Sequence, residues 1–124
     1  MMNIIIVGAG KVGYAIAKNL STGNDNVTII DNKMTALERI NNNLDVMCVK
    51  GNCTSLKVLN EAGIEEADLL ISVTNSDELN MLCSLAGKKL GAKHTVARVR
   101  NPGYDEDITL LTEAVGIDLV INPE

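Results

Sequence analysis

The sequence predicts an α/β fold: a doubly wound parallel sheet of six strands, in the order 3-2-1-4-5-6, with helices on both faces. Six short apolar runs recur along the 124 residues, and each run is continuous rather than alternating, as in strands covered on both faces. Every interval between runs is long enough for a helical crossover, so no join has to be a hairpin. We therefore expect one domain, covering residues 1–124.

The predicted elements follow one another in a regular order. The runs assigned to strands lie at 4–7, 27–30, 46–49, 69–73, 95–99 and 119–121. Apolar residues three and four positions apart predict a helix in each interval. These residues are Val12, Ala15, Ile16 and Leu20, then Leu37, Ile40 and Leu44, then Leu56, Leu59 and Ala62, then Leu79, Leu82, Cys83, Ala86 and Leu90, and finally Ile108, Leu111 and Val115.

The predicted helices carry signals at their ends. Gly63, Gly91 and Gly116 each follow an apolar stripe and precede a strand, where a left-handed cap favours a residue without a Cβ. At the start of the fourth helix, Asn75 and Glu78 predict a capping box.

Composition and charge exclude several classes of protein. The net charge is -5 and the chain has no Phe, no Trp and two Tyr, which argues against a nucleic-acid surface built on basic patches and stacking rings. The start of the chain lacks the basic region of a signal peptide, and no apolar run reaches the roughly 18 residues of a membrane span. We expect a cytoplasmic protein that does not itself span a membrane.

The three cysteines and the single histidine give a weak metal signal. Cys48, Cys53 and Cys83 have no paired spacing, which favours reduced thiols in the core or lining a site. A zinc site formed with His94 is the alternative, but no C-x-x-C or H-x-x-x-H spacing supports it. We expect no metal.

A glycine turn follows the first predicted strand. Its letters, GAGKVG at Gly8, Ala9, Gly10, Lys11, Val12 and Gly13, match G-x-G-x-x-G. The first glycine permits the tight turn, the second lets the backbone approach a pyrophosphate, and the third lets the helix pack close to the sheet. The helix N-terminus then offers N–H groups and a positive dipole to the phosphates.

An acid completes this fingerprint. Asp31 ends the second predicted strand and is expected to accept hydrogen bonds from the ribose hydroxyls, with Asn32 and Lys33 beside it. A 2′-phosphate there would meet a carboxylate, so NAD(H) is favoured over NADP(H), although Lys33 softens that repulsion. The alternative is a strand, turn and helix with incidental glycines and a helix-capping aspartate.

Two further loops belong to the same crevice. Ligands of open α/β sheets bind beyond the carboxyl ends of strands where the strand order reverses, here between the first and fourth strands. Thr74 and Asn75 therefore face the glycine turn, and Asn52, Cys53 and Thr54 are placed to flank an adenine ring. Ordinary helix capping by Asn, Ser and Thr explains both loops as well and is compatible with binding.

The fifth predicted strand ends with two arginines. Alternation places Arg98 and Arg100 on one face at the carboxyl end of a buried strand, where a guanidinium needs an anionic partner. A cofactor pyrophosphate suits Arg98. The alternatives are a salt bridge to Asp77, Glu78 or Asp105, or a place at an oligomer interface.

Catalytic groups are missing from this pattern. Hydride transfer needs an acid or base near the nicotinamide, whereas His94 starts the fifth strand, away from the crevice. A nucleotide sensor without chemistry is therefore favoured. The alternatives are the cofactor-binding half of an NAD-dependent dehydrogenase, and a methyltransferase-like domain, since an acid after the second strand also suits S-adenosylmethionine.

The chain resembles the N-terminal nucleotide-binding domain of TrkA-type potassium uptake proteins, a Rossmann-type domain called RCK, KTN or TrkA-N. The resemblance covers nearly the whole chain and rests on the stretches IIIVGAGKVGYAIAKNL, VTIIDNK, VKGNCTSLKVLNEAGIEEADLLISVTNSDELNML and VARVRNPGY with the final INPE. By position, the glycine turn corresponds to the family's phosphate loop, Asp31 to its ribose acid and Arg98 to its phosphate-facing strand. Asn52 departs from the Asp that the family often carries in its adenine site.

The resemblance implies a role and partners. Such domains are cytoplasmic regulatory subunits that bind NAD(H) or, in close relatives, ATP and ADP. They form dimers and larger rings beneath a membrane potassium transporter or channel, and the nucleotide gates the pore. A second, C-terminal domain is usual in the family and is absent from these residues.

Overall fold

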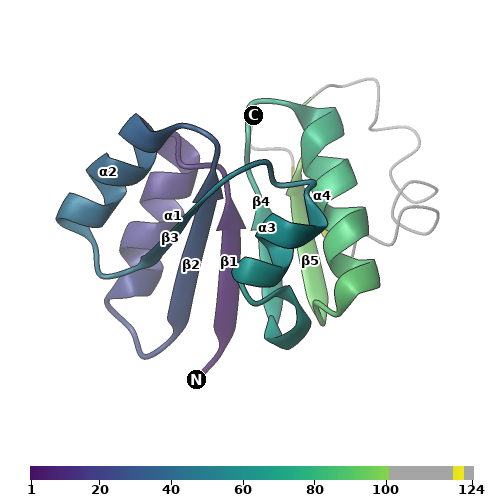
Figure 1. The fold of residues 1–124 in the computed structure, drawn as a ribbon, viewed down its shortest axis with the longest axis horizontal. Helices are drawn as coiled ribbons and strands as arrows, with labels where there is room; N and C mark the ends of the chain where they lie inside the picture. The colour runs from purple at the N-terminus through teal and green to yellow at the C-terminus, as the bar shows by residue number, and fades with distance from the viewer. Residues whose placement is uncertain (101–118, 122–124) are drawn as a thin grey trace.

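The computed structural model describes residues 1–100 and 119–121, and as far as the fifth strand its strands alternate with helical segments (Figure 1). In chain order they are β1 (Asn3–Val7), α1 (Lys11–Ser21), β2 (Asn26–Asp31), α2 (Met34–Asn43), β3 (Met47–Lys50), α3 (Leu56–Glu61), the 3-10 turn η1 (Ile64–Glu66), β4 (Leu69–Ser72), α4 (Asp77–Leu90), β5 (His94–Arg98) and β6 (Leu119–Ile121). The predicted fifth helix and Gly116 lie outside the described residues.

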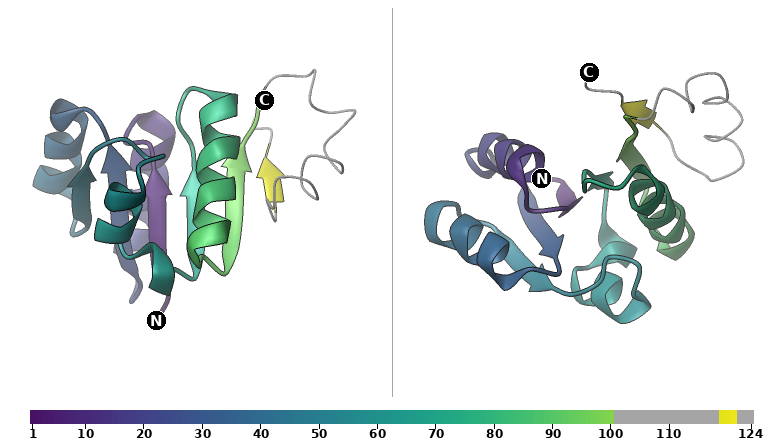
Figure 2. Two further views of the ribbon diagram at one scale, coloured as in Figure 1. Left: turned by 45° about the vertical axis from the view of Figure 1, so that its right-hand side comes forward. Right: turned by 90° about the horizontal axis from the view of Figure 1, so that it is seen from above.

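The strands form one parallel sheet in the order β3-β2-β1-β4-β5-β6, which confirms the predicted topology (Figure 2). β1 is central, and its last residue, Val7, is level with Ile30 of β2 and Ser72 of β4. The chain leaves β1 toward one edge of the sheet and returns on the other side at β4. The connections after β1 and β4 thus diverge and leave a crevice between them.

Alternate residues of β1 build the two halves of the core. Ile4 and Ile6 pack with α1 and α2 on one face, whereas Ile5 and Val7 pack with α3, η1 and α4 on the other. The core is aliphatic throughout, as the composition predicts. Because both faces are covered, the central strand is buried over nearly its whole length.

The buried face of α4 differs from the predicted apolar stripe. Leu82 is 51% exposed, whereas Leu79, Cys83, Ala86 and Leu90 pack against the core as predicted. The buried positions of the helix are small or polar: Asp77, Asn80, Cys83, Ser84 and Gly87. The reason is close packing, since a Cβ on Gly87 would lie 2.2 Å from Cδ2 of Leu70. Leu56 and Ala15, also predicted as inward-facing, are exposed.

The predicted helix ends are borne out at Gly63 but not at the start of α4, and Gly91 has φ 130° and ψ -4°, outside the left-handed helical region. Gly63 is left-handed, with φ 87° and ψ 35°, as predicted. The N-cap of α4 is Ser76, whose Oγ accepts a hydrogen bond from Leu79 N–H at 3.1 Å, so the capping box predicted at Asn75 is wrong. Asn75 lies one residue too early, because the helix begins at Asp77.

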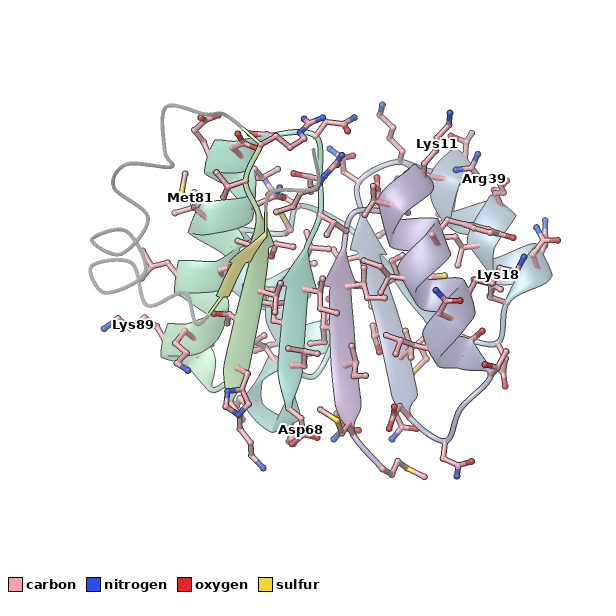
Figure 3. All side chains as sticks on the ribbon, turned by 180° about the vertical axis from the view of Figure 1, so that it is seen from behind. Lys11, Lys18, Arg39, Asp68, Met81 and Lys89 are labelled. Carbon is pink, nitrogen blue, oxygen red and sulfur yellow. The ribbon has the colours of Figure 1, made fainter. Side chains whose placement is uncertain are left out.

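Charged side chains extend from both helical layers, and Figure 3 shows Lys11 near the edge where the strands end and Asp68 at the opposite edge. Within residues 1–100, no helix has both the length and the apolar character that a membrane crossing requires.

Candidate functional site

A cavity of about 340 Å³ lies at the carboxyl ends of the central strands. Its walls come from the loops that follow β1, β2, β3 and β4. The predicted residues that line it are Gly8, Ala9, Gly10, Asp31, Asn32, Lys33, Asn52, Cys53, Thr74 and Asn75. Lys11, Val12, Gly13, Thr54 and Arg98 were predicted with them but do not line it. The fold therefore brings four separate predicted segments into one hollow.

The glycine turn packs back to back with the loop after β4. Gly8 has φ 110°, and a Cβ there would lie 3.0 Å from the carbonyl of Val73. Its N–H donates to the Ile30 carbonyl at 2.9 Å, which ties the turn to β2. A Cβ on Gly10, by contrast, would meet no atom within 4 Å. The turn is thus closed against the protein at Gly8 and open at Gly10.

The absence of a side chain at Gly13 makes room for the backbone of the glycine turn rather than for the sheet. A Cβ at this position would lie 1.7 Å from the carbonyl oxygen of Gly8, whereas the nearest sheet atom, Cδ1 of Ile29, would be 3.7 Å away. The predicted reason for this glycine therefore needs correction. The first turn of α1 folds directly onto the backbone of Gly8, and only glycine leaves room for it.

The two helices that start at the crevice differ at their N-termini. α1 begins after Gly10 with no side-chain cap and no acid in its first turn, and Tyr14 N–H makes the first intrahelical bond. The earlier N–H groups of the helix have no intrahelical acceptor. α4 is capped by Ser76 and carries Asp77 and Glu78 in its first turn. An anion is therefore stabilised at α1 and disfavoured at α4.

Asp31 is held in place by two backbone donors. Its Oδ2 accepts from Ala9 N–H and its Oδ1 from Lys33 N–H, both at 2.8 Å. Lys33 is the N-cap of α2 and makes no side-chain cap, so the helix-capping alternative for Asp31 does not describe α2. The carboxylate instead links the glycine turn to the end of β2 and borders the cavity.

The loop after β3 is shaped by its own side chains. Asn52 Oδ1 accepts from Thr54 N–H at 3.0 Å and from Thr54 Oγ1 at 2.8 Å. This pairing explains why Thr54 is absent from the cavity wall. Cys53, between them, is 5% exposed and lines the cavity.

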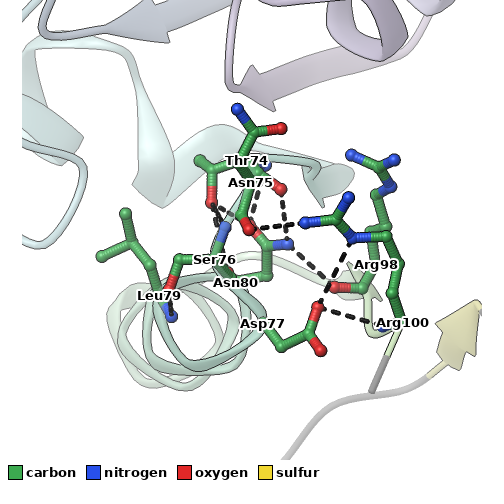
Figure 4. Close-up of polar contacts among 8 residues, drawn as sticks. All are labelled: Thr74, Asn75, Ser76, Asp77, Leu79, Asn80, Arg98 and Arg100. Carbon is green, nitrogen blue, oxygen red and sulfur yellow. Dashed lines mark hydrogen bonds and ion pairs between the residues drawn. The ribbon is translucent and has the colours of Figure 1, made fainter. Parts of the chain in front are cut away.

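Asn80 organises the loop after β4, and the sequence analysis missed it (Figure 4). Its Oδ1 accepts from Thr74 N–H at 2.8 Å and Thr74 Oγ1 at 2.6 Å. Its Nδ2 donates to the Thr74 carbonyl at 3.1 Å and to the Arg98 carbonyl at 2.8 Å. Asn80 is fully buried and joins the cavity loop to the end of β5. A polar residue one turn before Cys83, on the inward face of a helix, was the available signal.

The two arginines have different surroundings. The guanidinium Nε of Arg100 lies 4.0 Å from Asp77 Oδ1, which is the salt bridge that one alternative predicts, and another guanidinium nitrogen donates to the Asn75 carbonyl at 2.6 Å. The backbone N–H of Arg100 also donates to Asp77 Oδ1 at 3.0 Å. The Nε of Arg98 is buried and has no hydrogen-bond partner among the described residues. Figure 4 shows its guanidinium apart from the contacts of Arg100.

A further cation borders the cavity. Arg39 of α2 lines it beside Lys33, with its guanidinium carbon 5.8 Å from the ring centre of Tyr14. It was not predicted, because a single exposed arginine on a helix gives no sequence signal. His94, by contrast, starts β5 at the end of the sheet away from the cavity. No group of three His, Cys, Asp or Glu side chains in the described part of the chain could hold a metal ion.

Curated relatives match nearly the whole chain. A Trk system potassium uptake protein TrkA homolog from Archaeoglobus fulgidus is 42% identical over 123 residues, and the TrkA protein of Vibrio alginolyticus is 39% identical over 126 residues. Each alignment covers 99% of this chain but only 28% of the relative. The chain thus spans less than a third of the length of these relatives.

Solved structures share the fold. The TrkA-N domain of the inner membrane protein ybaL from Escherichia coli gives a TM-score of 0.84 at 20% identity, covering 99% of this chain and 89% of that one. GsuK bound to ADP gives 0.77 at 30% identity, covering 98% and 30%. The GsuK channel bound to NAD gives 0.80 at 20% identity, covering 97% and 21%.

The family model described as the TrkA-N domain matches residues 4–123, which include all four loops of the cavity. Together with relatives near 40% identity along the same span, this match shows that the chain belongs to the TrkA-N domain family.

Proposed function

We propose that this chain is the nucleotide-binding regulatory domain of a potassium uptake system, which binds NAD(H) and transmits the nucleotide state to a membrane potassium transporter or channel. The observation that carries the proposal is the cavity in which the open N-terminus of α1 and the fixed carboxylate of Asp31 converge. These groups are complementary to the pyrophosphate and the ribose of a dinucleotide.

The residues fit such a ligand at several points. The pyrophosphate would lie on the glycine turn, where the open surface at Gly10 leaves room for it. Asp31 would accept from the ribose hydroxyls, and the loop with Asn52 and Cys53 would border the adenine. The buried Nε of Arg98, without a partner in the described residues, would gain an acceptor if the phosphates reach it.

NAD(H) is the favoured ligand within the nucleotide class. A 2′-phosphate would lie against the Asp31 carboxylate, which disfavours NADP(H). GsuK has been solved with NAD and with ADP, and ATP and ADP share the adenosine and phosphate groups of NAD. Adenine nucleotides are therefore the second candidates for the same cavity.

The site supports sensing rather than turnover. His94, the only histidine of the chain, lies at the opposite end of the sheet, and the titratable groups on the cavity wall belong to Asp31, Lys33, Arg39 and Cys53. The loop after β4, which lines the cavity, is tied to α4 and to the end of β5 through Asn80, so occupancy can change its position. A shift in population, without product, is the mechanism that this arrangement favours.

The partner and the assembly are part of the proposal. The matching relatives are named as Trk potassium uptake proteins, and one structural neighbour is a channel. We infer a cytoplasmic homodimer, or a larger ring, at the inner face of the membrane. Sedimentation velocity of the purified chain, with and without nucleotide, measures the oligomeric state directly.

Calorimetric titration tests ligand binding. The purified chain is titrated at fixed salt with NADH, NAD+, ATP, ADP, NADPH and S-adenosylmethionine. NADH should bind at least about tenfold more tightly than NADPH, since one unfavourable charge contact is worth roughly 1.4 kcal/mol or more. Tight binding of S-adenosylmethionine alone would support the methyltransferase reading instead.

A pair of variants distinguishes direct phosphate binding by Arg98 from the effect of losing one positive charge anywhere on the chain. Arg98→Ala should weaken NADH binding about tenfold or more, because a charge-assisted hydrogen bond contributes about 1.5–3 kcal/mol. Lys18→Ala, at an exposed position in the last turn of α1, removes the same charge and should leave binding unchanged. Folded protein that binds none of the nucleotides contradicts the proposed function.

A further inference from the structure

Two of the three cysteines meet beneath the cavity. Cys53, in the loop after β3, is 5% exposed, and Cys83, on the inward face of α4, is fully buried. Both side chains belong to the same core cluster, and each thiol is the main influence on the pKa of the other. Cys53 also lines the cavity, whereas Cys83 does not, so only one thiol of the pair faces the ligand site.

The third cysteine has different surroundings. Cys48 packs against the core cluster on the other face of the sheet, and its Sγ donates to the Leu37 carbonyl at 3.8 Å. It has neither a thiol partner nor a place on the cavity wall among the described residues. Cys48 therefore provides an internal control for any chemistry of the pair.

The two thiols of the pair differ in acidity. Interaction with the neighbouring Cys83 thiol lowers the pKa of Cys53, and this effect outweighs the desolvation that raises it. Interaction with Cys53 and burial raise the pKa of the Cys83 thiol far above its usual range. The thiolate is thus favoured on Cys53, which is the nucleophilic form of a thiol, at the position open to the cavity.

We propose that Cys53 and Cys83 form an oxidisable dithiol site, in which hydrogen peroxide entering through the nucleotide cavity converts the pair into a disulfide. The Cys53 thiolate attacks one peroxide oxygen, the O–O bond breaks, and the departing hydroxide takes a proton to become water. The Cys83 sulfur then displaces the hydroxyl of the Cys53 sulfenic acid, and its proton leaves with that hydroxyl as a second water. Two thiols are oxidised and one peroxide is reduced to two waters.

The disulfide would act on the ligand site. Forming an S–S bond of about 2.0 Å draws the loop with Asn52 and Cys53 toward α4. The same helix, one turn earlier, carries Asn80 and through it the Thr74 loop on the other side of the cavity. This coupling rests on the proposed function: bound nucleotide covers Cys53, and oxidation reshapes the wall that the nucleotide contacts.

The first experiment needs no nucleotide. The reduced chain is treated with hydrogen peroxide, its remaining thiols are alkylated, and intact mass and peptide mapping follow. We expect a loss of about 2 Da before alkylation, a fall from three to one in the number of thiols that can be alkylated, a peptide linking 53 to 83, and full reversal by dithiothreitol. Oxidation of Cys48 first, or links only between separate chains, overturns the dithiol site.

Matched variants assign the roles. The Cys48→Ser variant should form the disulfide between Cys53 and Cys83 at the same rate as the unmodified chain. Cys83→Ala should form no internal disulfide and should leave a Cys53 sulfenic acid that dimedone traps, whereas Cys53→Ala should give neither product. If Cys83→Ala yields no trapped sulfenic acid although circular dichroism shows it folded, Cys53 is not the reacting thiol.

The second experiment tests access through the cavity. NADH at ten times its dissociation constant leaves about one molecule in eleven unliganded, so disulfide formation should slow about tenfold. The oxidised chain should in turn bind NADH at least about fivefold more weakly than the reduced chain. An oxidation rate that saturating NADH does not change overturns access through the cavity. If calorimetry detects no nucleotide binding but the disulfide forms, the proposed function fails while the dithiol site stands.

Discussion

Asp31 occupies its position before any ligand arrives. Backbone N–H groups of Ala9 and Lys33 each engage one of its carboxylate oxygens at 2.8 Å. Each oxygen keeps a further lone pair for a ribose hydroxyl. A ligand therefore meets two acceptors whose orientation is already fixed, which reduces the ordering that binding has to supply.

The first prediction concerns this carboxylate. Asp31→Asn keeps the size of the side chain but replaces one acceptor by an NH₂ group, which cannot accept from either backbone donor. NADH affinity should fall about tenfold or more, since hydrogen bonds to a charged group contribute roughly 1.5–3 kcal/mol. Calorimetry measures the change, and Asp45→Asn, at an exposed position before β3, is the matched control. Equal affinity of both variants would show that Asp31 does not meet the ribose.

The second prediction concerns the stability that Asn80 contributes. Asn80→Ala would leave the buried polar groups of Thr74 and the Arg98 carbonyl without their partner, which should lower the free energy of unfolding by about 2–4 kcal/mol. Urea denaturation measures it. Asn42→Ala, exposed on α2, should change stability by less than about 0.5 kcal/mol. A loss no larger than that of the control would mean that water replaces the side chain.

These two residues show where sequence reasoning works at this scale and where it stops. Asp31 was predicted because its type and its distance from the glycine turn form a fingerprint. Asn80 was not, because its place on the inward face of a helix indicates burial but not which groups it would bond. Its four hydrogen bonds depend on where a loop after β4 and the end of β5 meet.

At the scale of elements, the crevice is defined by two helix N-termini of opposite character. α1 presents free backbone donors behind a glycine turn, whereas α4 is capped by Ser76 and begins with two acids. Only the first can stabilise a phosphate. The geometry of that first turn is set by how closely α1 approaches Gly8.

The third prediction tests this approach. Gly13→Ala places a Cβ 1.7 Å from the Gly8 carbonyl oxygen, so the turn must shift. Overpacking of this kind costs about 1–3 kcal/mol and exceeds the helix propensity that alanine gains, about 1 kcal/mol, when the neighbour is backbone. We expect lower stability in urea and weaker NADH binding. Gly23→Ala, whose Cβ would come no nearer than 3.6 Å to another residue, is the control, and equal effects in both variants would contradict the prediction.

The helix faces were predicted less well than the helices themselves. Apolar spacing located α1 to α4 to within a residue or two. It placed Leu82 and Leu56 inside, although both are more than half exposed, because it counts apolar residues and not available space. α4 lies so near β4 that small side chains face the sheet, as Gly87 does against Leu70.

At the scale of the whole molecule, the strand order of the sheet could be predicted from the pattern of apolar residues. Continuous apolar runs with helical intervals admit only parallel crossovers, and the right-handed crossover rule leaves few strand orders, one of which is observed. The same topology brings the loops after β1 and β4 together. What the pattern cannot supply is the set of contacts between these loops, because they join residues more than 60 positions apart, such as Gly8 and Val73.

The last prediction concerns stability of the entire fold. The proposed nucleotide would contact loops from both halves of the sheet, at a site that exists only in the folded chain. At one hundred times its dissociation constant, NADH should raise the free energy of unfolding by about 2.7 kcal/mol. For a domain of this size that is about 8–10 °C in melting temperature.

Differential scanning calorimetry at several NADH concentrations measures the shift, and its concentration dependence gives an affinity independent of titration. Asp31→Asn should need about tenfold more NADH for the same shift, because a ligand stabilises only through its affinity for the native state. NADPH provides the matched ligand control and should act more weakly than NADH at equal concentration. A shift of equal size with both dinucleotides would place the ribose away from Asp31, and the loops after β1 and β4 alone would then hold the ligand.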